Sequence, residues 1–167
     1  PSGVTVFNYG TTWKYLDNGS NQGTAWTGTG FNDASWASGA AELGYGDAPV
    51  TPVNYGPDVN NKYVTTYFRK TINISNPSSY SIFNANIRRD DGCIVYVNGT
   101  QVYISNLSGT VAFNTYATNA ADDGATPQPF SIPSSAFVSG NNVIAVEMHQ
   151  SSASSSDLTF DMELTAN

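Results

Sequence analysis

The stretch from Arg88 to Gly92 reads RRDDG, and it is the densest group of charged residues in the chain. Two carboxylates beside two arginines could form an acid–base pair, a cation site or a charged turn. Side chains of adjacent residues in an extended chain point to opposite sides, so Asp90 and Asp91 do not form a facing pair. We interpret the stretch as a turn in which the arginines keep both carboxylates ionised and Gly92 adopts a positive φ. A salt bridge from Asp90 to Arg69 or Arg89 agrees with this interpretation, and calcium ligation or a contact of Asp90 with a sugar hydroxyl stays open.

The single histidine and the single cysteine limit the other chemistry that the chain can carry. Cys93 lies in the apolar run CIVYV, which predicts a buried and unreactive thiol and leaves no partner for a disulfide. One histidine and one cysteine cannot supply a transition-metal site of several soft ligands. The serines from 151 to 156 form a flexible run rather than a nucleophile elbow. We therefore predict that His149 makes a structural hydrogen bond at the end of a strand, with a ligand contact as the alternative.

Calcium is the metal that the composition still allows, because it takes six to eight oxygen ligands from carboxylates, amides and carbonyls. The carboxylates and amides at Asp17, Asn18, Asp157 and Asp161 are the expected ligands, and the Gly46–Asp47 loop is a further candidate. The acidic turn Asp122-Asp123-Gly124 is expected to be solvated.

Aromatic residues carry the hypothesis of sugar binding, since sugar rings present apolar faces that stack on aromatic side chains. Trp26 and Tyr45 are predicted to be exposed platforms, whereas Phe31 and Trp36 are assigned to the core. Polar side chains would complete the contacts with the sugar hydroxyls. The predicted carbohydrate-binding residues are Trp26, Tyr45, Asp47, Tyr55, Tyr67, Arg69, Asp90 and His149.

These side chains must be positioned by strands, because apolar residues alternate with polar ones and no segment has a helical period. Asn98-Gly99 is a strong signal for a tight hairpin. A long aromatic-rich loop is expected from Asp17 to Lys62, and the final strand is expected to have one dry and one wet face. Strands are predicted at 4–6, 13–16, 63–74, 80–88, 93–97, 101–104, 130–132, 142–150 and 158–164. This pattern predicts an all-β fold, an antiparallel β-sandwich of jelly-roll type.

Composition and charge exclude some partners. Only 11% of the 167 residues are charged, and the formal net charge of −7 would repel a phosphate backbone. No apolar run approaches the ~20 residues that span a membrane. The surface of uncharged polar residues without disulfides is typical of a secreted or cell-surface bacterial protein. We expect residues 1–167 to be a single module excised from a larger secreted protein, with linker remnants in PSG at the start and TAN at the end.

Several motifs follow one another along the chain: FNDASW at 31–36, GYGD at 44–47, TTYFRKTINI at 65–74, RRDDGCIVYVNG at 88–99 and GNNVIAVEMHQ at 140–150. In this order they resemble the galactose-binding-like jelly-roll modules of secreted bacterial enzymes. They are also similar to the N-terminal sugar-binding domain of β-galactosidase-type glycoside hydrolases. Relatives often carry Glu-Val-x-Arg after the Asn-Gly turn, but residues 101–104 here are QVYI, so both charges are missing.

The resemblance implies a non-catalytic carbohydrate-binding module that holds a secreted enzyme on a polysaccharide. Its partners would be the polysaccharide and a catalytic domain in the same parent chain. The alternative is an accessory or adhesion domain that packs against its neighbour and binds no sugar. An enzyme would need two facing carboxylates about 5–10 Å apart, and no such pair is evident in the sequence.

Overall fold

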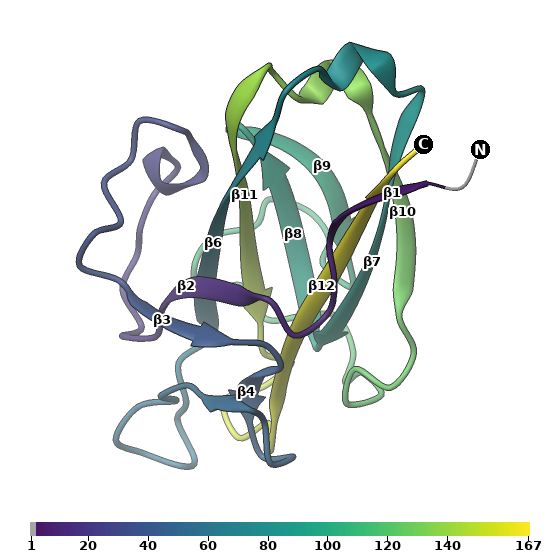
Figure 1. Ribbon diagram of the computed structural model, residues 1–167. Coiled ribbons are helices and arrows are strands. Elements are labelled where there is room, and N and C mark those ends of the chain that lie inside the picture. The colour runs from purple at the N-terminus through teal and green to yellow at the C-terminus, as the bar shows by residue number, and fades with distance from the viewer. Residues whose placement is uncertain (1–2) are drawn as a thin grey trace.

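The computed structural model describes residues 3–167 and confirms the all-β prediction (Figure 1). Every predicted strand is present, and the elements are β1 (Val4–Phe7), β2 (Thr12–Leu16), η1 (Ala25–Thr27), β3 (Ala37–Ala40), β4 (Leu43–Tyr45), β5 (Thr51–Pro52), β6 (Thr65–Ile74), η2 (Pro77–Ser79), β7 (Ile82–Asp90), β8 (Gly92–Val97), β9 (Thr100–Ser105), β10 (Gln128–Pro133), η3 (Ser134–Ala136), β11 (Gly140–His149) and β12 (Leu158–Ala166). The helical elements of the described residues are single 3₁₀ turns of three residues. None of the described helices is long and apolar enough to cross a membrane.

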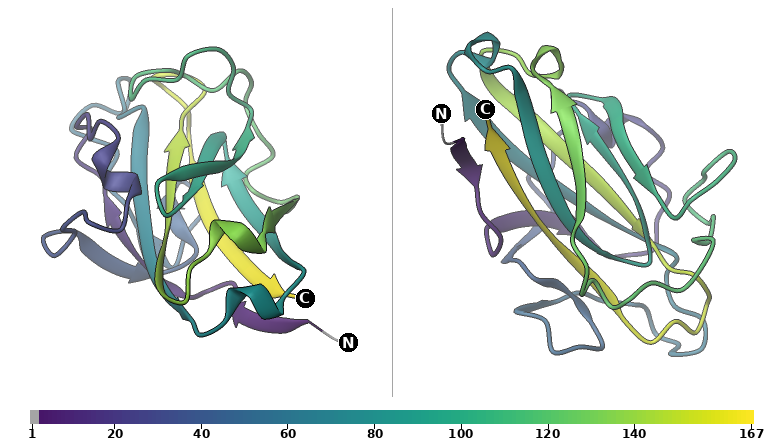
Figure 2. Two further views of the ribbon diagram at one scale, coloured as in Figure 1. Left: turned by 90° about the horizontal axis from the view of Figure 1, so that it is seen from above. Right: turned by 90° about the vertical axis from the view of Figure 1, so that its right-hand side faces the viewer.

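The strands form two six-stranded sheets that face each other as a sandwich (Figure 2). Sheet A has the order β10-β7-β12-β4-β5, and β1 also pairs with β12. Sheet B has the order β3-β2-β6-β11-β8-β9. All pairs are antiparallel except the short pair of β4 with β5. The predicted antiparallel sandwich is therefore confirmed.

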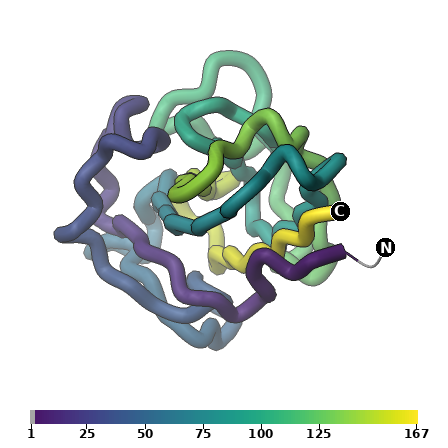
Figure 3. Tube along the Cα trace, turned by 45° about the horizontal axis from the view of Figure 1, so that its top comes forward, coloured from purple at the N-terminus to yellow at the C-terminus, as the bar shows by residue number. Residues whose placement is uncertain are grey.

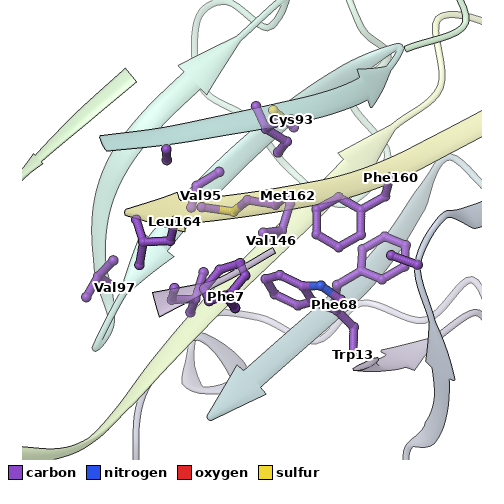
Figure 4. Close-up of a cluster of buried hydrophobic side chains, with 14 of the residues drawn as sticks. Phe7, Trp13, Phe68, Cys93, Val95, Val97, Val146, Phe160, Met162 and Leu164 are labelled. Atoms are coloured by element: carbon purple, nitrogen blue, oxygen red, sulfur yellow. The ribbon is translucent and has the colours of Figure 1, made fainter. Parts of the chain in front are cut away.

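The core fills the space between the two sheets and consists of the side chains that point inward from the strands of both sheets (Figure 4). The Trp13 ring lies edge-on to Phe7 and Phe160, with centroid distances of 5.8 and 4.8 Å. Strand β12 shows the predicted dry face, but the first half of its other face is also buried, since Thr159 and Asp161 are 1% and 6% exposed. The predicted wet face is wrong for these residues because Gly124 packs against Thr159 and the Gly10 amide bonds Asp161, whereas Glu163 and Thr165 are half-buried.

The segment from Asp17 to Lys62 is more ordered than the predicted loop, because it contains η1, β3, β4 and β5. These strands are only two to four residues long, and β3 consists of small residues, so they are too short to show a clear alternating pattern. The first part of the segment folds over the outer face of sheet B beside β6 (Figure 1). There Trp26 and Trp36 pack on Tyr67, Val143 and Ala145 in a second apolar cluster, which we call the outer cluster.

The Asn98-Gly99 hairpin is confirmed, with φ of 50° and 87° at its two central residues. The RRDDG stretch, in contrast, is not part of a hairpin. Strand β7 ends at Asp90 in sheet A and β8 begins at Gly92 in sheet B, so the chain crosses between the sheets at Asp91. Gly92 lies in the strand and does not have a positive φ. Its glycine is required by close packing instead, since a Cβ there would lie 2.9 Å from the Asn106 carbonyl oxygen.

The two ends of the described chain lie beside each other (Figure 3), because Val4 pairs with Ala166 across β1 and β12. The predicted linker at the C-terminus is therefore wrong, since Thr165 and Ala166 belong to β12 and the Asn167 carbonyl accepts from Ser81. The first two residues of the predicted N-terminal linker, Pro1 and Ser2, lie outside the described residues.

Candidate functional site

A hollow of about 220 Å³ opens on the outer face of sheet B, and we call it the tyrosine hollow. Its floor comes from three adjacent strands: Tyr67 on β6, Glu147 on β11 and Tyr96 on β8. Tyr67 and Glu147 are paired in register, and both point away from the core that their neighbours fill. The walls are two loop segments, Asn21–Thr24 and Val111–Phe113. The hollow is therefore a polar, aromatic recess on a rigid sheet.

A hydrogen-bonded network fixes the polar floor. The Tyr96 hydroxyl donates to Glu147 Oε2 at 3.4 Å, and Glu147 Oε1 lies 3.0 Å from His149 Nε2. His149 is fully buried, and its Nδ1 lies 2.7 Å from the Thr115 carbonyl oxygen. Burial, and then the Glu147 carboxylate, raise the pKa of the Tyr96 phenol. The floor thus offers a neutral phenol and a carboxylate in fixed positions to a ligand with hydroxyl groups.

The wall at Asn21–Thr24 is anchored by the outer cluster. The Trp26 indole donates to the Gly23 carbonyl at 3.1 Å, and Arg69 donates to the carbonyls of Trp26 and Gly28. Arg69 is 2% exposed, and its Nε lies 2.9 Å from Asp33 Oδ2. Burial acts to raise the pKa of Asp33, but the bonds from Arg69 and Lys14 outweigh it and lower that pKa. Arg69 and Asp33 therefore position this wall from beneath.

The opposite wall carries Phe113, which is 37% exposed. Phe113 also lines a second hollow of about 380 Å³, which contains Tyr63, Lys62 and Asp58 and which we call the lysine hollow. The backbone under Phe113 is held, because its carbonyl accepts from the Thr65 hydroxyl at 2.5 Å. An exposed aromatic ring thus stands between two recesses with polar linings.

The structure places the predicted sugar-binding residues in two separate groups. Tyr67 lines the tyrosine hollow, while Trp26, Arg69 and His149 lie behind its surface. The expected exposed platform at Trp26 is wrong, because its ring is fully buried against Trp36, Tyr67 and Tyr96. The predicted strand-end hydrogen bond of His149 is confirmed.

The second group lies near the end of β4. Tyr45 is 7% exposed and packs on the Tyr55 ring at 5.1 Å, so the expected platform at Tyr45 is also wrong. Asp47 is exposed, whereas Asp90 is 1% exposed. The expected salt bridge of Asp90 is wrong, since Arg69 pairs with Asp33 and no described cation pairs with Asp90. Burial and the neighbouring carboxyls of Asp91 and Asp157 raise the pKa of Asp90 to about 9, so the expectation of two ionised carboxylates is wrong as well.

The predicted calcium ligands do not form one site. Asp17 accepts from the Asn54 amide at 2.6 Å, and Asn18 caps its own turn at Ser20. Asp161 accepts from the Gly10 and Met162 amides. Only Asp157 of these four joins a group of carboxylates in the described chain, together with Asp47 and Asp123.

Sequence reasoning missed Phe113, Tyr96 and Glu147 as residues that line one hollow. Glu147 and His149 are two residues apart on one strand, and this spacing was the available signal for their shared face. Phe113 had no such signal, because it lies in a segment without strand periodicity.

Together, these features define the class of protein as an antiparallel β-sandwich module. Sequence comparison finds no matching family model and no matching curated protein. Similar folds occur in solved glycoside hydrolases. The β-glucuronidase 2 of Bacteroides uniformis, solved with a covalently bound aziridine, matches with a TM-score of 0.60 and 18% identity over 99% of this chain and 18% of its own.

Two other enzymes show the same relation. The Bifidobacterium dentium β-glucuronidase matches with a TM-score of 0.56 and 12% identity over 89% of this chain and 20% of its own. A glycosyl hydrolase family 2 member from Bacteroides cellulosilyticus matches with a TM-score of 0.58 and 14% identity over 96% of this chain and 20% of its own. A calcium-binding mutant of the B. uniformis enzyme is also among the matches. The chain thus spans about a fifth of each enzyme, and the likeness confirms the predicted resemblance at the level of fold.

Proposed function

We propose that this chain is a non-catalytic carbohydrate-binding module and that it binds a neutral polysaccharide across Phe113. The observation that carries the proposal is an exposed aromatic ring between two recesses lined by tyrosines and polar side chains. Such a ring can stack on the apolar face of a sugar, while fixed polar groups bond its hydroxyls. The module would serve a catalytic domain in a secreted bacterial parent chain, as the fold's occurrence in glycoside hydrolases supports.

The charges of the site favour a neutral sugar over an acidic one. The tyrosine hollow contains the Glu147 carboxylate and no cationic side chain among its lining residues. In the lysine hollow Lys62 is 6% exposed and donates to the Val59 carbonyl at 2.9 Å, and Asp58 lines the same hollow. A uronic acid there would place two carboxylates close together, which costs free energy. Calcium is not part of the proposed sugar site, because Glu147 and Asp58, which line the two hollows, do not belong to the group of three neighbouring carboxylates found in the described chain.

The alternative of a packing module would require a continuous apolar patch. The large apolar side chains that are exposed among the described residues come from separate elements, and only Phe113 and Tyr116 share a loop. This distribution favours the binding module.

The test is binding of the module to a panel of neutral and acidic polysaccharides by affinity electrophoresis and pull-down. We expect retention on a neutral glycan, and Phe113→Ala should weaken it at least about tenfold, the effect of losing roughly 1.4 kcal/mol of contact. Tyr116→Ala is the matched control, because Tyr116 is 43% exposed three residues away and lines neither hollow. Absence of retention on every glycan would overturn the proposal, as would equal losses in the two variants.

A further inference from the structure

A cluster of acidic side chains lies at the loop end of the sandwich, apart from both hollows. Oxygen atoms of Asp47, Asp123 and Asp157 lie within 4.8 Å of one another, although the three residues come from different loops. Carboxylates at this spacing repel each other unless a cation or a proton lies between them. None of the salt bridges of the described residues involves these three side chains. The folded chain therefore brings negative charge together without a protein cation to balance it.

A second observation points to the same place. The Asp90 side chain is 1% exposed, and no donor among the described residues reaches its Oδ2. Asp90 is paired in register with Thr159, which lies two residues after Asp157, and Gly124 beside Asp123 packs against Thr159, whose hydroxyl oxygen is also buried without a partner, so the Asp90 carboxyl lies beside the acidic cluster. Buried polar atoms nearly always have a partner, and a carboxyl oxygen without one is costly. Asp91 shows the contrast, since it accepts from the amides of Ala121 and Ser151 at 2.8 and 2.7 Å.

The backbone around the cluster is fixed in position. Arg88 donates to the carbonyls of Gly124 and Ala125, each at 3.1 Å, which holds the turn that carries Asp123. Gln150 donates to the Asp157 carbonyl at 3.0 Å. The oxygen atoms are therefore held near one another before any ligand arrives, which lowers the cost of binding.

We propose that Asp47, Asp123 and Asp157 bind a calcium ion, with Asp90 behind Asp157 as a positioning residue. The donor atoms are all oxygens, which favours a hard cation over zinc or copper. Calcium accepts several carboxylates in irregular geometry, whereas magnesium usually keeps its waters and takes one or two carboxylates. The ion would join three loops and neutralise their charge, so it would stabilise the fold. The sugar hollows share no residue with this site, so either proposal can fail without the other.

The experiment is a calcium titration of the chelator-treated module at pH 7 and constant ionic strength, by calorimetry and by thermal melting. Terbium luminescence gives an independent readout, because Tyr45 bonds Gln150 beside Asp157 and can sensitise a bound lanthanide. We expect one site per chain and a Tm that rises with calcium concentration, since a ligand of the folded state stabilises it.

The variants Asp47→Asn and Asp123→Asn should weaken calcium binding at least about tenfold, which is about 1.4 kcal/mol. Both positions are exposed, so the variants should fold, and asparagine tolerates the positive φ of 58° at Asp123. Asp122→Asn is the matched control, because it makes the same change of charge one residue away and keeps an acceptor for the Thr126 amide. No saturable binding would overturn the proposal, and so would an equal loss in Asp122→Asn, which would indicate general charge screening.

Discussion

The buried ion pair between Arg69 and Asp33 gives the sharpest test of how the wall of the tyrosine hollow is held. Asp33 bonds two cations at the same distance of 2.9 Å, but their surroundings differ. The Arg69 side chain is 2% exposed and that of Lys14 is 39% exposed. One carboxylate thus allows a buried and an exposed ion pair to be compared directly.

Asp33→Asn should destabilise the fold by about 2–3 kcal/mol. Breaking a fully buried pair costs about 3–5 kcal/mol, because it leaves an uncompensated buried charge. We take a smaller value because Asp33 is 20% exposed and because Arg69 keeps its bonds to the carbonyls of Trp26 and Gly28. Lys14→Met should cost about 0–1 kcal/mol, as exposed pairs do.

The assay is urea unfolding followed by tryptophan fluorescence, since Trp26 and Trp36 lie in the outer cluster that Arg69 supports. Equal losses in Asp33→Asn and Lys14→Met would refute the reasoning, because burial would then have no effect on the strength of the pair. The pH dependence gives a second check. The folded pKa of Asp33 is lowered, so its stabilisation is complete above the unfolded pKa of about 4 and is lost as the pH falls through the folded value. The difference between wild type and Asp33→Asn should therefore shrink below about pH 4.

Three further changes test the fold and its corrections. Trp26→Ala should cost about 3–5 kcal/mol in urea unfolding, because the indole is fully buried, whereas a solvent-exposed platform would cost little. Gly44→Ala should unfold the domain or lower its Tm sharply, because a Cβ would overlap the Leu158 carbonyl oxygen, whereas Gly30→Ala, which meets nothing within 4 Å, should melt like the wild type. Cys93 should resist iodoacetamide at pH 8 until urea unfolds the chain, because burial excludes the reagent and raises the pKa of the thiol to about 12, and rapid labelling of the native protein would contradict this.

The strands could be predicted because burial on one side imposes a period of two, as in Phe160, Met162 and Leu164. The short strands β3 and β4 could not, because Ala37–Ala40 consists of small residues and Leu43–Tyr45, although two of its side chains enter the core, is only three residues long. Strand β3 forms by pairing with β2, and β4 forms by pairing with β12. Because these partners are not adjacent in the sequence, the local sequence does not show that the short strands form.

The site was harder to predict than the fold, because the same residue types serve burial and binding. Trp26 lies in a glycine-rich stretch without a strand pattern, which is the setting expected of an exposed platform. It is buried because Tyr67 and Ala145 form an apolar surface on the outer face of sheet B, and the segment that carries Trp26 covers this surface. Likewise Asp123 looks like a solvated turn residue in the sequence, and only the fold brings it to Asp47 and Asp157.

The two proposed sites lie on one connecting segment between β9 and β10, which carries both Phe113 and Asp123. Along this segment, a calcium ion could affect sugar binding through the residues between Phe113 and Asp123. That stretch is held to other parts of the chain, since the Ala117 amide donates to the Gln150 carbonyl and the Ala121 amide to Asp91 Oδ1, each at 2.8 Å. These bonds should isolate one end of the segment from the other.

We therefore expect chelation to lower the Tm of the module but to change its affinity for a glycan by less than about twofold, a difference of roughly 0.4 kcal/mol. Affinity electrophoresis below the Tm, with calcium and with chelator, measures this directly, and Asp123→Asn should behave as the chelated wild type does. A loss of affinity that follows calcium removal in step with the lower Tm would show that the segment moves as one unit. In that case the hydrogen bonds of Ala117 and Ala121 do not separate its two ends, and the two sites are energetically coupled.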